Sequence, residues 1–214
     1  MGREKGSTHV TVRVTHPHLE RGVSMDNKER IMQCGEELFY AKGYDAAGVQ
    51  EIVEMAGVTK PTLYYYFGSK RGLLEAVLDV KAQKLKLRIR EEMDRPGDIR
   101  QKLHYVANVY YHFFLEEHKF YMLLMALFYS ARENEAYQAV KPYLADFYRW
   151  IRELFENASQ ELGNMNGRQE QFAISFIGAL NQFLVFLWDQ ETPVGQGQRQ
   201  IDGLVDQYLH GIFS

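Results

Sequence analysis

The sequence predicts an all-α protein of about nine helices, with an N-terminal three-helix helix-turn-helix domain followed by a larger helical region. Apolar residues recur at helical spacing through most of the 214 residues. Hydrophobic residues make up 46% of the chain and only 5 residues are proline, which suits long helices around a sizeable core. The stretch from Val49 to Lys70 joins two short helical patterns by a tight turn. Together these observations favour helices throughout.

Two amphipathic helices are expected first. One runs over about residues 28–42 and stops at Gly43, because glycine favours the conformations found at helix ends. The next begins near Val49, since Val49, Ile52 and Ala56 fall on one face of a helix. Their apolar faces predict the core of a small domain.

A turn and a third helix follow. Gly57 stands where a left-handed residue is needed, and Thr59 is a suitable N-cap for the next helix. Pro61 is tolerated in the first turn, where its missing N–H has no intrahelical partner. Leu63 and Phe67 share the inner face of this helix. The opposite face carries Lys60, Thr62, Tyr65 and Tyr66. This pattern is typical of a helix-turn-helix whose second helix lies in the DNA major groove.

The same region resembles the DNA-binding signature of TetR-type transcriptional regulators. The resemblance lies in AGVTKPTLYYYFGSKRGLL and extends back through ERIMQCGEELFYAKGYDAAGVQEIVEMAGV, covering roughly residues 26–78. It implies a DNA-binding domain over 26–72 and an effector-binding and dimerisation domain over 73–214. The implied function is a sequence-specific, ligand-responsive regulator, a repressor released from a palindromic operator by a hydrophobic small molecule. An activator of the same fold is the alternative.

The resemblance also implies which residues contact double-stranded DNA. They are Gln50, Thr59, Lys60, Pro61, Thr62, Tyr64, Tyr65, Tyr66 and Lys70. Lys60 is expected to donate to a guanine edge and Lys70 to the phosphate backbone. Tyr64 is the candidate for which packing beside Leu63 competes most strongly with DNA contact. For Gln50 and Tyr65, a base contact and an ordinary surface position both stay open.

One departure from the family pattern concerns the start of the second helix. Similar proteins place a hydroxylated residue there, whereas this chain has Ala47 and Gly48. Glycine is an acceptable N-cap, so the helix is expected to form. The side-chain phosphate contact is lost, although backbone N–H groups at that helix start can still face a phosphate.

Residues 1–25 lack helical periodicity and are expected to be a flexible leader or a non-native start. Three readings stay open: an arm touching DNA, sequence upstream of a natural start at Met25, or a tail without a role. The arm would act through Arg3, Lys5, Arg13 and Arg21. The start of the family resemblance just after Met25 favours the two readings without a DNA role.

The rest of the chain predicts six more helices. A long basic helix from Lys70 is broken at residues 93–97 by a Pro-Gly pair. The others are expected over about 98–116, 118–130, 134–162, 168–190 and 198–212, with a loop at 163–167 and a flexible connection over 189–197. Pro142 is expected to kink the third of these five or to mark its effective start.

An effector pocket is implied by the resemblance and supported by an excess of aromatic and methionine side chains. The candidate lining is Tyr110, Phe113, Phe114, Met122, Met125, Phe128, Tyr129, Phe147 and Trp150. For any single residue, plain core packing is the simpler explanation. As a group, however, these apolar side chains with two polar ones, His112 and Asn181, suit an adaptable apolar cavity. The implied effector is hydrophobic or aromatic.

A homodimer is expected through the helices at 168–190 and 198–212. The first of these is apolar on more than one face, and small residues including Ala173 and Gly178 permit close helix approach. A monomer would expose this surface as a large sticky patch.

Other function classes find little support. The chain lacks a Gly-rich phosphate loop, a zinc motif and a G-x-S-x-G elbow, so no enzyme, cofactor or metal site is expected. Cys34 lies on an apolar stripe and reads as a core residue. No apolar run is expected to reach the length of a membrane span, which favours the cytoplasm. A net charge of −3 is a weak objection to DNA binding. A helical protein-binding adaptor is a further alternative.

Overall fold

The computed structural model describes residues 26–158 and 167–210, in which every regular element is an α-helix. The helices are α1 (Asn27–Lys42), α2 (Val49–Ala56), α3 (Lys60–Phe67), α4 (Lys70–Met93), α5 (Ile99–Glu116), α6 (His118–Phe128), α7 (Glu135–Asn157), α8 (Gln169–Asp189) and α9 (Val194–His210). The all-α prediction with about nine helices is confirmed for this part of the chain. The N-terminal leader, including the candidate arm, lies outside the described residues.

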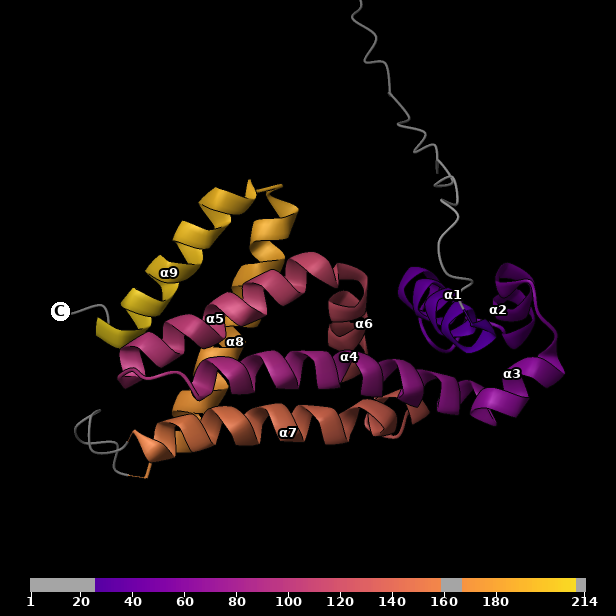
Figure 1. Ribbon diagram of the computed structural model, residues 1–214, viewed down its shortest axis with the longest axis horizontal. Helices are drawn as coiled ribbons and strands as arrows, with labels where there is room; N and C mark the ends of the chain where they lie inside the picture. Colours follow the sequence, from indigo (N-terminus) through magenta and orange to yellow (C-terminus); the bar gives the residue numbers. More distant parts are fainter. Residues whose placement is uncertain (1–25, 159–166, 211–214) are drawn as a thin grey trace, which may run out of the picture.

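The first three helices form a small N-terminal group at one end of α4 (Figure 1). Gly57 ends α2 with φ 63° and ψ 36°, the left-handed conformation that glycine adopts without steric cost. The turn then lets α3 fold back, so that Ile52 and Leu63 are both fully buried. Leu73 of α4 closes this core and packs directly on Gly35 of α1, where a Cβ would lie 2.8 Å from its side chain.

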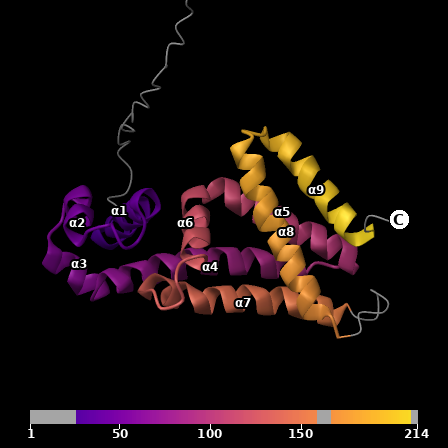
Figure 2. The same cartoon turned by 180° about the vertical axis from the view of Figure 1, so that it is seen from behind.

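Helix α4 connects the N-terminal group to the rest of the molecule. Ser69 caps it by accepting a hydrogen bond from the N–H of Gly72 at 2.9 Å. Its apolar stripe packs against α5 and α7. The helix therefore runs from the N-terminal group into the larger helical region (Figures 1 and 2). Helix α4 therefore contacts both the N-terminal group, through α1 and α3, and the larger region, through α5 and α7.

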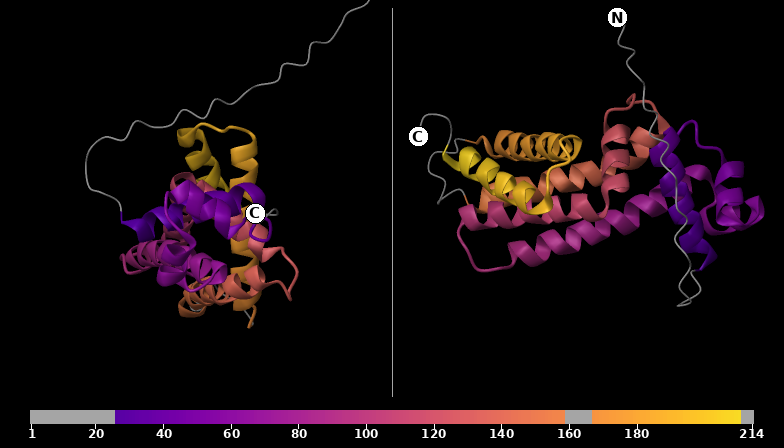
Figure 3. Two further views of the ribbon diagram at one scale, coloured as in Figure 1. Left: turned by 90° about the vertical axis from the view of Figure 1, so that its right-hand side faces the viewer. Right: turned by 90° about the horizontal axis from the view of Figure 1, so that it is seen from above.

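The larger region extends away from the N-terminal group, with α8 and α9 at the end farthest from it (Figure 3). Helices α4 and α7 lie side by side, while α5 and α6 pack on them and α6 also touches α1. Helices α8 and α9 form an antiparallel pair at the end of the molecule far from the N-terminal group. Helix α8 packs against α7, and α9 packs against α5.

Two expectations about the helices are corrected. The segment expected to be a flexible connection contains the first turn of α9, which begins at Val194. The carbonyl of Pro193 accepts bonds from the N–H groups of Gln196 and Gly197, both at 2.9 Å, which starts the helix. Pro142 lies inside α7 and does not mark its start.

The expectation that no apolar run reaches membrane-spanning length is also wrong. By length and composition alone α8 qualifies, with 21 residues and a mean hydropathy of 1.5 over its most apolar window. In this fold α8 packs against α5, α7 and α9 and buries one side of its surface there. Only 33% of that window is buried, so α8 also carries apolar surface that these contacts do not cover.

Candidate DNA-binding surface and effector cavity

Helix α3 presents the candidate DNA contacts on one exposed side. Leu63 is fully buried beneath the helix, whereas Tyr65 on the opposite side is 84% exposed and Tyr64 is 47% exposed. The rings of Tyr65 and Tyr66 meet edge to face at 5.2 Å between centroids, so Tyr66 supports the outward ring. The local sequence places these side chains because the helical period leaves one face for the core and one for solvent.

The two candidate lysines have different surroundings. Lys60 lies exposed in the first turn of α3, with no ion pair or hydrogen bond to another described residue. Lys70 points inward. Its ammonium donates to the carbonyl oxygens of Tyr44, Asp45 and Ala47 at 2.9, 3.3 and 3.2 Å. All three of its donors are thus committed to the turn between α1 and α2.

Three other candidates interact locally. Thr59 is the N-cap residue of α3, but its hydroxyl makes no cap bond and lies 3.0 Å from the hydroxyl of Thr62. The amide of Gln50 donates to Glu54 at 2.5 Å, along the same face of α2. The polar atoms of all three are at the surface and exchangeable with a DNA partner.

The start of α2 is occupied by a carboxylate. The backbone N–H of Gly48 donates to Glu51 at 3.3 Å, and Glu51 also pairs with Lys42 at 2.5 Å. The Lys42 bond, together with the Gly48 N–H, lowers the pKa of Glu51. A phosphate approaching this helix start must therefore displace a negatively charged side chain.

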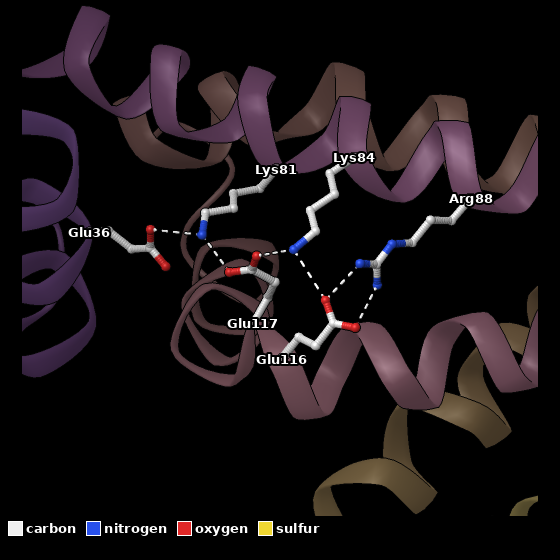
Figure 4. Close-up of polar contacts among 6 residues, drawn as sticks. All are labelled: Glu36, Lys81, Lys84, Arg88, Glu116 and Glu117. Atoms are coloured by element: carbon white, nitrogen blue, oxygen red, sulfur yellow. Dashed lines mark hydrogen bonds and ion pairs between the residues drawn. The ribbon is translucent and has the colours of Figure 1, made fainter. Parts of the chain in front are cut away.

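A charge network joins α4 to the corner between α5 and α6 (Figure 4). Glu117 at that corner receives hydrogen bonds from Lys81 and, at 2.6 Å, from Lys84. Burial alone would raise the pKa of Glu117, but these two lysines outweigh it and the pKa is lowered. Beside it, Arg88 donates two hydrogen bonds to the carboxylate of Glu116, at 3.0 and 2.7 Å. These bonds lower the pKa of Glu116 to about 2.

The same network reaches the N-terminal group. Lys81 also pairs with Glu36 of α1 at 3.5 Å, so one ammonium touches α1 and the α5–α6 corner (Figure 4). Burial raises the pKa of Glu36, with Lys81 opposing the rise. Lys119 of α6 reaches Glu37 of α1 in a second bridge. The N-terminal group is thereby tied to the corner that begins α6.

A third tie runs from the α1–α2 turn to α7. The hydroxyl of Tyr44 donates to Glu135 at 2.7 Å, and the amide of Asn134 donates to Asp45 at 2.8 Å. These partners stand about ninety positions apart in sequence, so helical periodicity carries no signal for the pairing.

Side chains from the five helices α4, α5, α6, α7 and α8 line a small, partly open cavity of about 30 Å³. The expected lining residues that the structure places there are Tyr110, Met125, Phe128 and Phe147. Those that sequence reasoning missed as lining are Leu85, Tyr121, Leu124, Leu144, Tyr148, Ile177 and Asn181, although Asn181 was expected as a polar point. The spacing on α6 could have predicted two of them, because Tyr121 and Leu124 lie on the same helical face as the expected residue Phe128.

The other expected lining residues lie elsewhere. Phe113 is buried against Phe120, and Phe114 meets Trp188 in a separate open groove. Tyr129 is 81% exposed, so it points to solvent. Met122 packs on the core outside the cavity lining, while Trp150 lines a surface groove under Lys86. His112 lines another surface groove beside Arg88. The aromatic excess thus serves core packing as well as the cavity.

Three tyrosines, Tyr110, Tyr121 and Tyr148, line the cavity. The hydroxyl of Tyr121 bonds to the side-chain oxygen of Asn181. Burial, together with the neighbouring Tyr148, raises the pKa of Tyr110. Burial and the proximity of Tyr110 likewise raise the pKa of Tyr121 well above its ordinary value. Burial also raises the pKa of Tyr148, so all three phenols stay neutral at physiological pH.

Helix α8 carries large apolar side chains that are exposed. Ile174 and Phe186 of α8 are each 50% exposed, and Gly178 lies between them on the exposed side. Tyr208 of α9 ties the two helices by donating to the carbonyl of Phe172 at 2.7 Å. Exposed aromatic and aliphatic side chains on one helix face are typical of an interaction surface.

Comparison with known sequences places residues 31–77 in a family described as bacterial regulatory proteins, tetR family. The chain is 34% identical over 107 residues to the HTH-type transcriptional activator FasR of Mycolicibacterium smegmatis, a match covering 49% of each chain. It is 41% identical over 51 residues to the HTH-type transcriptional repressor BdcR of Escherichia coli, covering 24% of this chain and 26% of BdcR. The chain thus spans about half, or less, of the length of these relatives.

Solved structures share the fold over nearly the whole chain. The fatty acid degradation regulator FadR of Bacillus halodurans superposes with a TM-score of 0.75 at 18% identity, covering 90% of this chain and 99% of FadR. FadR of Bacillus subtilis, solved in complex with stearoyl-CoA, gives a TM-score of 0.73 at 16% identity, with coverage of 86% and 98%. At these identities the likeness concerns the fold.

Proposed function

Because this chain belongs to the TetR family of bacterial transcriptional regulators, we propose that it is a sequence-specific, ligand-responsive DNA-binding protein. We propose further that it acts as a repressor, bound to a palindromic operator and released by a hydrophobic small molecule.

The observation that carries the DNA-binding proposal is the exposed face of α3. Lys60 stands there without a partner among the described residues, beside exposed Pro61 and the 84% exposed ring of Tyr65. An unpaired cation in the first turn suits donation to guanine, and an apolar neighbour suits a thymine methyl group. Tyr64, Thr62 and Tyr66 supply hydroxyls for phosphates.

A dimer through α8 and α9 is part of the proposal. Its support is the pair Ile174 and Phe186, each 50% exposed on an apolar helix of which only 33% of the most apolar window is buried. Two copies related by a two-fold axis would place their two α3 helices in successive major grooves, about 34–36 Å apart. A pseudo-palindromic operator follows from that symmetry.

The effector proposal rests on the cavity lined by α4 to α8. Its lining is apolar and aromatic, with partly exposed Met125 and Phe128 on one side, a composition that adapts to ligands of varied shape. FadR of Bacillus subtilis was solved with stearoyl-CoA, so a long-chain effector is one candidate by analogy. Filling the cavity would move its walls on α6 and α7, and the ties through Lys81 and Glu135 would pass that movement to the N-terminal group.

An activator is the second candidate, because FasR, the relative with the longest matched segment reported above, is an activator. The binding chemistry would be the same in both cases. The position of the operator relative to the promoter would separate them: overlap with the promoter favours repression, and an upstream site favours activation.

The first test is selection of bound duplexes from a random DNA pool. The expected result is a pseudo-palindromic site whose binding weakens steeply with salt, as counterion release requires. Absence of a preferred sequence would overturn the proposal. The second test uses linkage: an effector that lowers operator affinity must bind more weakly to the DNA-bound protein by the same factor. Equal effector affinity with and without operator would contradict the release mechanism.

A further inference from the structure

One of the residues that line the cavity has a buried polar group without a partner. Tyr110 is 4% exposed and its hydroxyl makes no hydrogen bond within the described part of the chain. The other buried tyrosines in that part each use their hydroxyl. Tyr44 bonds to Glu135, Tyr111 to the carbonyl of Val194, Tyr121 to Asn181 and Tyr137 to Arg132. Tyr110 is therefore the exception among them.

The unpaired hydroxyl is unfavourable for folding alone. A buried hydroxyl without a partner loses its hydrogen bond to water and gains nothing in return. The ring by itself packs well, since it meets Phe147 edge to face at 6.5 Å between centroids. Phenylalanine would keep that contact without the lost bond. The hydroxyl is therefore available to donate to a group that enters the cavity.

The cavity lining also restricts the charge of a ligand. Apart from neutral phenols and the amide of Asn181, the lining groups are apolar, and no lysine, arginine or carboxylate is among them. The nearby Lys86 lies over the outer ring of Trp150, in a surface groove on the far side of Phe147. A carboxylate buried in the cavity would lose its hydration without a compensating cation.

We infer that the cavity takes an uncharged amphipathic effector with an apolar body and one carbonyl acceptor, such as an ester, thioester, amide or ketone, and that the Tyr110 hydroxyl donates to this carbonyl. The inference rests on the proposed function, because it assigns ligand chemistry to the same effector cavity.

The size of the cavity adds a conformational consequence. Its volume of about 30 Å³ is far below the roughly 300–1,000 Å³ of typical small-molecule pockets. An effector must therefore push the walls apart, and the partly exposed side chains Met125, Phe128 and Leu144 form the side that can yield. These residues lie on α6 and α7, which carry the ties to the N-terminal group.

The test compares three probes of similar length: methyl octanoate, octanoate and 1-octene. Each competes with the neutral fluorescent probe N-phenyl-1-naphthylamine on the full-length protein at pH 7. We expect methyl octanoate to displace the probe at concentrations at least 10-fold lower than octanoate. Tyr110→Phe should weaken methyl octanoate about 3- to 10-fold, the loss of one neutral hydrogen bond, and leave 1-octene unchanged.

A stability measurement makes the result specific. Tyr110→Phe should unfold at the same temperature as the wild type or higher, because it removes an unpaired group. Tyr121→Phe is the matched control: it breaks the bond to Asn181 and should lower the unfolding temperature. A lower unfolding temperature for Tyr110→Phe with unchanged ester binding would make its hydroxyl structural and overturn the inference.

The outcomes also separate this inference from the proposed function. Operator binding with no displacement by any of the three probes, or preference for octanoate, would overturn the cavity inference alone. Ester binding that depends on Tyr110 in a protein that selects no DNA sequence would support it and overturn the proposed function.

Discussion

The ammonium nitrogen of Lys70 lies 2.9 Å from the carbonyl oxygen of Tyr44 and 4.4 Å from the centre of the Tyr44 ring. Its remaining donors reach the carbonyls of Asp45 and Ala47. One side chain from the start of α4 thereby holds the whole turn between α1 and α2. A residue that local sequence reasoning directs toward phosphate is instead an anchor of the N-terminal group.

Lys70→Met should destabilise the protein. The change keeps the aliphatic stem and removes three bonds from a charged donor to carbonyls, each of a kind that contributes about 1.5–3 kcal/mol. We expect a loss of about 2 kcal/mol or more in the free energy of unfolding, measured by urea titration. An unchanged free energy of unfolding would show that the anchor has no role in stability.

Lys60→Met should act on DNA affinity without altering stability, since Lys60 has no partner among the described residues to lose. Binding to the selected operator should weaken, the base preference at one position should relax, and the salt slope should fall by up to about one unit. Fluorescence anisotropy at several salt concentrations measures each effect. The Lys70 variant is the control, and equal loss of stability in both variants would contradict the distinction.

Gly197→Ala should separate α9 from α5. A Cβ at Gly197 would lie 2.2 Å from the hydroxyl oxygen of Tyr111, which itself donates to the carbonyl of Val194. We expect overpacking to cost about 1–3 kcal/mol, seen as a lower midpoint in thermal unfolding followed by circular dichroism.

The matched control lies in the same helix. Gly203→Ala meets no heavy atom within 4 Å and should be neutral or stabilising by up to about 1 kcal/mol through helix propensity. If both glycine variants behaved alike, the close approach of α9 to Tyr111 would not be a constraint on stability.

Glu117→Gln should make stability less dependent on pH. Because the folded-state pKa of Glu117 is lowered, its contribution is fully present above the unfolded value of about 4.5 and is lost as pH falls through the folded value. The variant should therefore be less stable than the wild type at pH 7, by about 1.5–3 kcal/mol, and the gap should close on acidification.

Urea unfolding at pH 7, 5 and 3 measures this gap. Glu116→Gln is the control, since its side chain is 47% exposed and its pair with Arg88 is screened by solvent. A smaller effect at pH 7 is expected for that variant. A gap for Glu117→Gln that persisted unchanged at pH 3 would contradict the role assigned to the lysine bonds.

Phe186→Glu should disrupt the proposed dimer. The side chain is 50% exposed on α8, and a carboxylate there would be buried without a partner in a two-fold interface. Sedimentation at micromolar concentration should show a shift toward monomer. Val80→Glu, at a position 56% exposed on α4, should leave the oligomeric state unchanged. A dimer that survives Phe186→Glu would place the interface on another face.

Helix boundaries near the N-terminus were predictable because their signals are local. Gly57 takes the positive φ that a glycine stop implies, and Ser69 caps α4 with its own hydroxyl. The start of α9 was missed for the opposite reason. Glycine and proline between residues 193 and 197 indicate a turn when only neighbours in sequence are considered, but Gly197 is required by the side chain of Tyr111 on another helix.

By itself the sequence determined the all-α class, the face of α3 that is exposed and the family, because helical period and capping depend on residues a few positions apart. Only the tertiary structure decided which of those side chains are already bonded to other parts of the protein and which are free to bind a partner. Lys70 finds its carbonyls more than twenty positions back, and Tyr110 faces a cavity with walls from α4 to α8. Periodicity tells which side of a helix is buried, but the neighbour that meets it follows from how the helices pack.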